Sequence, residues 1–295
     1  MSERDTFKKI CARLPATIRS QLEQLPASTV CNIEEIRLRC GQNIKLHTNA
    51  GEKTVLYEVN ASELMSTLNS LIKYSYYAYE EDLAKGFVTI EGGHRVGICG
   101  KAVIKDGKTA LIREISSVNI RFAKEIKGCA EKIISILIEN NGKPSNTLIV
   151  SPAGCGKTTL LRDITRTLSN SGIKVAVCDE RSEIAGMYGS IPSFDLGPRT
   201  DILDGAPKSQ GMEMLIRSMS PQVIVTDEIG KTEDLKALGQ CLCTGTTIIS
   251  STHGSSRNDI INSPLGELVE KGFFKHLVYL SSKKGPGTVE NIESA

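Results

Sequence analysis

The segment TLIVSPAGCGKTTLLRDITRTL, residues 147–168, restricts the possible fold more than any other part of the chain. It begins with a short apolar run that predicts a buried strand, and it continues through a loop that contains Gly154 and Gly156. Apolar residues at helical spacing follow, at positions 160, 161, 164 and 168. The segment therefore predicts a strand, a glycine-containing loop and a helix in direct succession, which is how a domain with alternating strands and helices is built.

The rest of the C-terminal half repeats this alternation. A helix is predicted at AEKIISILIEN, and between further helical stretches lie four more apolar runs: KVAVC (174–178), QVIVT (222–226), TTIIS (246–250) and LVYLS (277–281). The runs do not alternate between apolar and polar residues, which is typical of strands covered on both faces in a parallel sheet. We therefore expect an α/β domain with a mainly parallel sheet.

The N-terminal half has a different pattern. Residues 33–59 alternate like an antiparallel meander, with Ile36 and Leu38 on one face of the first strand. Asn60 and Glu63 have the spacing of a helix N-cap and its reciprocal carboxylate, and strand-like segments return after the helix. This grouping predicts a smaller α+β domain over residues 1–116, a linker over 117–128, and the α/β domain over 129–295.

Composition excludes several classes of protein. Among the 295 residues, Lys and Arg exceed Asp and Glu by only two, so the net charge gives no reason to expect nucleic acid as a partner. The nine cysteines are scattered and odd in number, without a C-x-x-C pair, and there are only four histidines. We expect reduced thiols and no zinc site.

No segment has the pattern of a membrane anchor. The N-terminus MSERDTFKKICARL lacks the apolar region of a signal peptide, and no apolar run approaches the ~20 residues needed to span a bilayer. Any association with a membrane is expected to be peripheral.

The glycine loop matches the phosphate-binding pattern G-x-x-x-x-G-K-[ST], except that Ser151 replaces the first glycine. Such a loop binds phosphate because successive backbone N–H groups at a helix N-terminus point at the anion. Lys157 can reach the β- and γ-phosphates, and the Thr158 hydroxyl can bind Mg²⁺. We predict an ATP and Mg²⁺ site formed by Ser151, Pro152, Ala153, Gly154, Cys155, Gly156, Lys157, Thr158 and Thr159.

Two carboxylates complete the predicted chemistry. Asp227 and Glu228 follow the apolar strand QVIVT, where Asp227 can support the Mg²⁺ site and Glu228 can activate a water molecule for attack on the γ-phosphate. Ser251, Thr252 and His253 end the next strand and are placed to sense the γ-phosphate. These residues predict a RecA-like P-loop NTPase domain that hydrolyses ATP.

The order of motifs resembles the ATPases of the type II and type IV secretion superfamily. The motifs are AVCDERSEIAG, LIRSMSPQVIVTDEIG and ISSTHG, all C-terminal to the loop. The resemblance implies an acidic box at Asp179, Glu180 and Glu183, an arginine at Arg217 and a histidine box at His253. On this basis the predicted catalytic residues are Lys157, Glu183, Arg217, Glu228 and His253.

A more specific resemblance, over about residues 30–282, is to the stage III sporulation AA family. It rests on EEIRLRCGQ, GCGKTTLLRD, DERSEIAG and MSPQVIVTDEIG in that order. The resemblance implies a cytoplasmic ATPase, held at the membrane by channel components, that energises or assembles a secretion-like channel between mother cell and forespore. A RecA-like ATPase that depends on nucleic acid is the alternative, and a small-molecule kinase lacks an arginine-rich lid here.

We also predict a homo-oligomeric ring, most simply a hexamer, because one P-loop subunit gives the γ-phosphate little cover. A cation from the neighbouring subunit can complete such a site. The resemblance to secretion ATPases favours Arg95, Arg113 and Arg121 for this role.

Two segments have no assigned chemistry. KYSYYAYEE places Tyr74, Tyr76, Tyr77 and Tyr79 close together, where stacking of single-stranded bases and packing within the N-terminal domain are the two interpretations. Packing is favoured. The C-terminal segment KKGPGTVENIESA is expected to be a solvated terminus.

Overall fold

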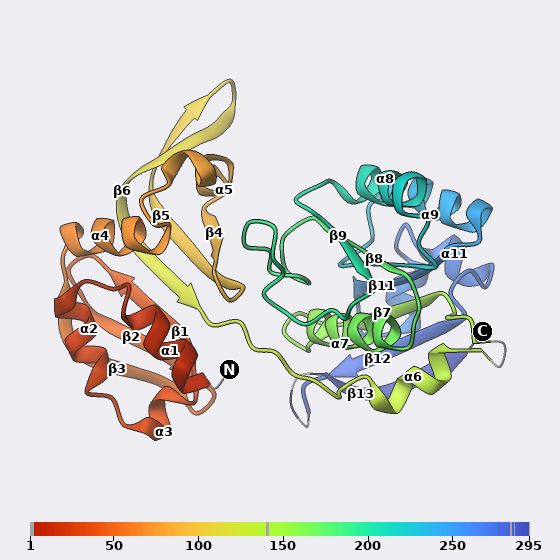
Figure 1. The fold of residues 1–295 in the computed structure, drawn as a ribbon, viewed down its shortest axis with the longest axis horizontal. Coiled ribbons are helices and arrows are strands. Elements are labelled where there is room, and N and C mark those ends of the chain that lie inside the picture. Colours follow the sequence, from red (N-terminus) through yellow and green to blue (C-terminus); the bar gives the residue numbers. More distant parts are fainter. Residues whose placement is uncertain (1–2, 140–141, 284, 286, 295) are drawn as a thin grey trace. The chain divides into compact units, whose positions relative to one another are not determined.

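The computed structural model describes residues 3–139, 142–283, 285 and 287–294. The chain divides into two compact units, Met1–Lys124 and Glu125–Ala295, each with its own sheet and its own apolar core (Figure 1). None of the helices within the described residues is both long enough and apolar enough to cross a membrane.

The first unit is an antiparallel sheet with helices. Its elements are α1 (Glu3–Cys11), α2 (Ala16–Glu23), α3 (Ala27–Val30), β1 (Ile33–Arg39), β2 (Gln42–Thr48), β3 (Gly51–Val59), α4 (Ala61–Leu71), the 3₁₀ helix η1 (Tyr76–Tyr79), α5 (Glu80–Ala84), β4 (Phe87–Ile90), β5 (His94–Lys105) and β6 (Lys108–Arg121). The sheet order is β3-β2-β1-β6-β5-β4.

Local sequence explains much of this unit. Ile36 and Leu38 are fully buried, as the alternation in β1 predicts. The side chain of Asn60 accepts a hydrogen bond from the Glu63 N–H, and the Glu63 carboxylate accepts one from the Asn60 N–H, so the predicted capping box begins α4. Asp106 and Gly107 both have positive φ angles, which closes the β5–β6 hairpin in two residues.

The second unit is an α/β sandwich. Its elements are α6 (Glu131–Leu137), β7 (Thr147–Ser151), α7 (Lys157–Asn170), β8 (Val175–Asp179), β9 (Thr200–Asp204), α8 (Lys208–Met219), β10 (Val223–Thr226), α9 (Thr232–Thr244), β11 (Thr247–His253), α10 (Arg257–Ile261), α11 (Gly266–Glu270), β12 (His276–Ser281) and β13 (Thr288–Ser294). The sheet order is β13-β12-β7-β11-β10-β8-β9. All neighbouring strands are parallel except β12 and β13, so the predicted, mainly parallel sheet is confirmed.

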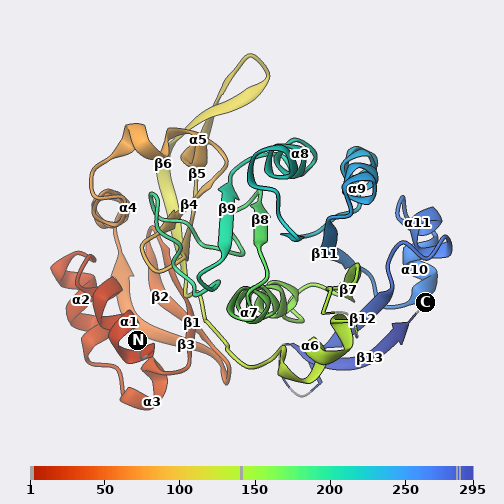
Figure 2. The ribbon, with the colours of Figure 1, turned by 45° about the vertical axis from the view of Figure 1, so that its right-hand side comes forward.

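Helices cover both faces of this sheet (Figure 2). Ile149 of β7 packs in one apolar cluster with α6 and α7, whereas its neighbours Leu148 and Val150 pack in a second cluster with α8, α9, α10 and α11. Because successive side chains of a strand point to opposite faces, the continuous apolar run of β7 supplies both clusters.

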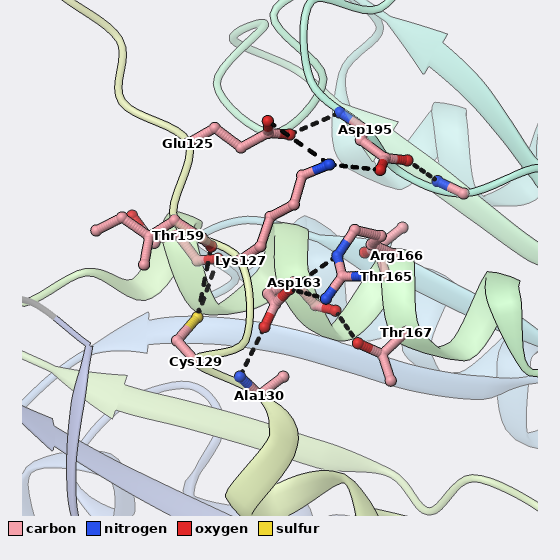
Figure 3. A network of polar contacts seen from close by, with 12 residues as sticks. Glu125, Lys127, Cys129, Ala130, Thr159, Asp163, Thr165, Arg166, Thr167 and Asp195 are labelled. Atoms are coloured by element: carbon pink, nitrogen blue, oxygen red, sulfur yellow. Dashed lines mark hydrogen bonds and ion pairs between the residues drawn. The ribbon is translucent and has the colours of Figure 1, made fainter. Parts of the chain in front are cut away.

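The joint between the units differs from the prediction. Residues 117–121 belong to β6, where they pair with β1, and the first unit extends to Lys124. Residues 125–130, which follow, are tied to the second unit (Figure 3). The Glu125 carboxylate accepts a hydrogen bond from the Asp195 N–H at 2.8 Å, and Lys127 Nζ lies 2.6 Å from Asp195 Oδ2.

Asp163 on α7 holds the end of this segment. Its Oδ2 accepts a hydrogen bond from the Ala130 N–H at 2.8 Å, and its Oδ1 pairs with Arg166 at 2.6 Å (Figure 3). These contacts lower the pKa of Asp163 although its burial acts in the opposite direction. The carboxylate on the helix after the glycine loop thus ties Ala130 to α7.

Candidate nucleotide-binding site

The glycine loop lies between the end of β7 and the start of α7. Gly154 and Gly156 have φ angles of +76° and +89°, in the left-handed region that only glycine adopts without strain. At Gly154 an added Cβ would meet nothing within 4 Å, so glycine is needed there for its backbone angle and not for space. Gly156 directly precedes the 14-residue helix α7, whose N-terminal N–H groups form an anion-binding end.

Ser151, which replaces the first glycine of the pattern, is the last residue of β7 and is fully buried. Its backbone has no positive φ angle, so a Cβ is tolerated. Its carbonyl accepts a hydrogen bond from Gly254 N–H at 3.3 Å, and its hydroxyl bonds to the Pro152 carbonyl. Ser151 thus anchors the entry to the loop.

Lys157 is folded over the loop. Its Nζ donates to the carbonyls of Ser151 and Pro152, each at 3.2 Å, and lies 3.9 Å from Glu228 Oε1. The side chain is only 7% exposed. The ammonium group of Lys157 is therefore surrounded by oxygen atoms of the loop and of Glu228.

The ends of β10 and β11 bring three further side chains to the loop. Thr158 Oγ1 donates to Asp227 Oδ2 at 3.2 Å, and Ser251 Oγ donates to Asp227 Oδ1 at 2.5 Å. The same Ser251 hydroxyl accepts a hydrogen bond from the Glu228 N–H at 3.0 Å. These contacts join the loop helix, the acidic pair and the neighbouring strand in one network.

Glu228 has a positive φ angle, which is unusual for a residue other than glycine. Its φ angle is +41°, which costs about 1–2 kcal/mol for a residue other than glycine. Ser251 holds this turn, because its hydroxyl bonds to the Glu228 N–H and its carbonyl accepts from the Ile229 N–H. The Glu228 side chain is 45% exposed and lies between Lys157 and Arg181, whose Nη1 is 3.4 Å from Glu228 Oε2.

Asp179, in the acidic segment at the end of β8, has a structural role. Asp179 is buried and accepts hydrogen bonds from the N–H groups of Glu183, Ile184 and Ala185 at 2.8–2.9 Å. Burial raises the pKa of Asp179 to about 6, against the effect of these donors. Glu180 pairs with the buried Lys208 at 2.6 Å. The carboxylate of Asp179 therefore shapes the loop that carries Glu183.

Arg162, which the sequence motifs do not single out, supports the same loop. Its guanidinium donates to the carbonyls of Glu183 and Ile184 and lies 3.8 Å from the centre of the Phe194 ring. Burial lowers the pKa of this arginine. Its position in the helix after the phosphate loop is the one signal in the sequence that connects it to the site.

Of two further predicted catalytic residues, His253 lies beside the phosphate loop, whereas Arg217 lies away from it. His253 ends β11 beside Ser151 of β7, and its side chain is exposed. Arg217 lies in the last turn of α8, 75% exposed and paired with Glu213. Since α8 leads into the N-terminal end of β10, a single chain does not bring Arg217 to the phosphate loop.

The three arginines predicted to act between subunits lie in the first unit. Arg95 on β5 is the direct neighbour of Arg121 on β6 and stacks over the Phe87 ring at 3.7 Å. Arg121 pairs with Glu35 at 3.2 Å, and Arg113 is exposed on the β5–β6 hairpin.

The C-terminal segment is not a solvated terminus as predicted. Residues 288–294 form β13, which pairs with β12. The N–H of Gly287 donates to the carbonyl of Cys155 in the glycine loop at 2.7 Å. Gly287, which directly precedes β13, therefore braces the loop.

The donors at the site fit a nucleotide with its metal ion. Thr158 and Asp227 offer a hydroxyl and a carboxylate oxygen 3.2 Å apart, and oxygen atoms are the ligands that Mg²⁺ prefers. Backbone N–H groups and Lys157 supply positive partners for phosphate, and Glu228 supplies a carboxylate that is partly open to solvent.

Comparison with known proteins identifies the family of the chain. Residues 3–295 match the family described as "Sporulation stage III, protein AA". The "Stage III sporulation protein AA" of Bacillus subtilis (strain 168) is 41% identical over 293 residues, which is 97% of this chain and 94% of the relative.

Solved structures share the fold at low sequence identity. The Legionella pneumophila ATPase DotB is 17% identical with a TM-score of 0.60, covering 90% of this chain and 76% of that chain. The pilus retraction motor PilT, solved with bound ADP, is 12% identical with a TM-score of 0.59, covering 89% and 76%. The chain thus shares its fold with DotB and PilT, and by sequence it belongs to the stage III sporulation protein AA family.

Proposed function

We propose that this chain is a Mg²⁺-dependent ATP hydrolase that works as a ring. The observation that carries the proposal is the network in which Ser251 holds Asp227 and Glu228 against Thr158 and Lys157. Loop, cation, metal-binding oxygens and a candidate base meet there at one end of a parallel sheet. The fold shared with DotB and with ADP-bound PilT supports nucleotide as the ligand.

Each residue has a role in this proposal. Lys157 exchanges its two loop carbonyls for phosphate oxygens, and the loop N–H groups contact the remaining oxygens. A Mg²⁺ ion held by Thr158 and Asp227 would neutralise phosphate charge. Glu228 accepts the proton of the attacking water molecule, and Ser251 keeps its backbone turn in place.

For the biological role we propose energising or assembling a trans-envelope channel during sporulation, by a cytoplasmic ring recruited through membrane-embedded partners. Membership of the stage III sporulation protein AA family supports the setting, and the motor-like fold supports the mechanism. A cell lacking its own family member and carrying the Glu228→Gln protein at normal level should fail to complete sporulation.

The enzymatic part is tested by phosphate release and nucleotide binding on purified protein. Lys157→Ala should lose ATP binding, because the phosphates lose the cation that the loop itself supplies. Glu228→Gln should still bind ATP while hydrolysis falls by about 10²–10⁴-fold, the usual contribution of a general base. Glu267→Gln, an exposed carboxylate on α11, serves as the matched control and should hydrolyse ATP normally. Unchanged turnover in Glu228→Gln would remove the proposed base.

A further inference from the structure

Segment 73–81 projects some of its tyrosines into solvent, whereas Tyr79 packs against the core of the first unit as predicted. Tyr77 is 95% exposed and Tyr74 is 73% exposed, so the predicted packing within the unit is wrong for these two residues. Tyr76 is partly exposed, and its hydroxyl bonds to Asn69 on α4 at 2.8 Å. We call Tyr74, Tyr76 and Tyr77 the tyrosine patch.

The backbone holds the patch in place. Lys73 and Tyr74 have φ angles of +51° and +57°, a strained conformation for two successive residues that are not glycine. The turn is fixed by hydrogen bonds from Tyr74 N–H to the Asn69 carbonyl at 2.8 Å and from Ser75 N–H to the Ile72 carbonyl at 3.1 Å. The rings are therefore presented by an ordered turn, which lowers the entropy cost of binding to them.

Two exposed carboxylates follow the patch. Glu80 and Glu81 are exposed in the first turn of α5, and within the described ranges their side chains form no ion pair or hydrogen bond. The nearby charges are already paired: Lys73 lies 3.5 Å from Glu91, and Lys85 lies 3.4 Å from Asp82. The free charge beside the tyrosines is thus negative.

We propose that the tyrosine patch, with Glu80 and Glu81, binds an arginine-containing basic peptide segment of a partner protein. Guanidinium groups stack on aromatic faces and pair with carboxylates, so one arginine-rich segment satisfies both parts of the surface. The same chain already stacks Arg95 on Phe87 and Arg162 on Phe194. A nucleic acid would stack on the rings but would bring phosphates toward two unpaired carboxylates.

This surface is independent of the phosphate loop, so its test does not rely on ATP turnover. Fluorescence anisotropy of the full chain would use labelled twelve-residue peptides that alternate leucine with arginine, lysine or glutamate, and a labelled oligothymidylate. We expect the arginine peptide to bind best and the glutamate peptide and oligothymidylate not to bind. Tyr74→Asn with Tyr77→Ala should weaken arginine-peptide binding at least about tenfold, as for central aromatic contacts in interfaces. Asparagine tolerates the positive φ angle at position 74.

Glu80→Gln with Glu81→Gln should remove the preference for arginine over glutamate. Ile191→Ala, which changes an exposed apolar residue of the second unit, is the control and should bind like the unaltered chain. The proposal is overturned if the arginine peptide does not bind, if it binds equally to the tyrosine variant, or if oligothymidylate binds in its place.

Discussion

Ser251 has a larger part at the site than its position at the end of an apolar strand indicates. One hydroxyl donates to Asp227 and accepts from the Glu228 N–H, and the Ser251 carbonyl accepts from the Ile229 N–H. Because Glu228 has a strained backbone angle, the turn depends on these contacts. Ser251 therefore positions both carboxylates.

Ser251→Ala should reduce ATP turnover by about 10–100-fold, the range seen when a supporting hydrogen-bond partner at a metal site is removed. Nucleotide binding should change less, because Lys157 and the loop remain. Ser251→Thr keeps the hydroxyl and should recover turnover. Ser250→Ala is the control, since the Ser250 hydroxyl bonds to the Thr226 carbonyl and not to a carboxylate. The measurement is steady-state phosphate release. Equal losses of turnover in Ser251→Ala and Ser250→Ala would contradict the positioning role of Ser251.

The residues of the loop could be predicted from sequence because their chemistry is contained in nine consecutive positions. Asp227 and Glu228 could also be placed, since they end a recognisable strand. Arg162 and Arg181 could not, because their contacts depend on how the loop after β8 folds back on α7 and β10. The exposure of Tyr74 was missed because aromatic residues are usually buried, and a strained turn at Lys73 and Tyr74 has no local sequence signal.

At the scale of elements, the buried strands were predictable and the edge strands were not. β7, β8 and β10 are wholly buried and appear as continuous apolar runs. β9 and β13 lie at the two edges of the same sheet, where each has one neighbour and a partly exposed surface. Their sequences, TDILD and TVENIES, are correspondingly rich in polar residues, so periodicity gives little indication of a strand.

β5 is linked to the end of β6 by a buried histidine. His94 Nδ1 accepts a hydrogen bond from the Ala123 N–H at 3.0 Å, just beyond β6, and the ring lies 5.7 Å from that of Phe122. Burial lowers the pKa of His94 to about 4. A proton on Nδ1 would remove the acceptor, so this contact requires the neutral ring.

The stability of the first unit should therefore depend on pH through His94. The unfolded chain binds a proton near pH 6.5 and the folded chain near pH 4, so the contribution is complete above pH 6.5 and is lost as pH falls toward 4. The total loss is at most about 3.5 kcal/mol, since one pKa unit corresponds to about 1.4 kcal/mol. Urea unfolding, followed by tyrosine fluorescence, measures the free energy of unfolding at each pH. This free energy should fall between pH 6.5 and pH 4 in the unaltered chain, and should fall less in His94→Gln. Parallel pH dependence in both proteins would contradict the assignment.

At the scale of the whole molecule, the net charge bears on the alternative function, that of a nucleic-acid-dependent ATPase. A net charge of +2 over 295 residues gives little attraction for a polyanion, and tight binding to phosphates requires clustered Lys and Arg. We expect single-stranded DNA and RNA to leave ATP turnover unchanged when titrated into the assay at low salt. A several-fold increase that disappears at higher salt would favour a nucleic-acid-dependent ATPase.

The proposed ring assembly is the remaining question at this scale, and it concerns which cation completes the site. Among the described residues, Lys157 and Arg181 are the cations paired with Glu228 in one chain, and Lys157 also bonds to the loop carbonyls. A cation supplied by a neighbouring subunit can increase phosphoryl transfer by about 10³–10⁵-fold. Arg95, Arg113 and Arg121 stand on adjacent strands, and the exposed Arg113 and Arg121 can reach another subunit without unfolding the sheet.

Mixed rings test this prediction. One subunit carries Lys157→Ala and keeps its arginines, and the other carries Arg95→Gln, Arg113→Gln and Arg121→Gln and keeps its loop. Each alone should be inactive, whereas mixing should restore turnover at interfaces where the second subunit binds ATP and the first supplies the cation. A mixture of Lys157→Ala with Glu228→Gln subunits is the control and should stay inactive, because neither loop is then both able to bind ATP and equipped with its base. If rings shown by native mass spectrometry to be mixed regain no activity, these arginines do not act between subunits.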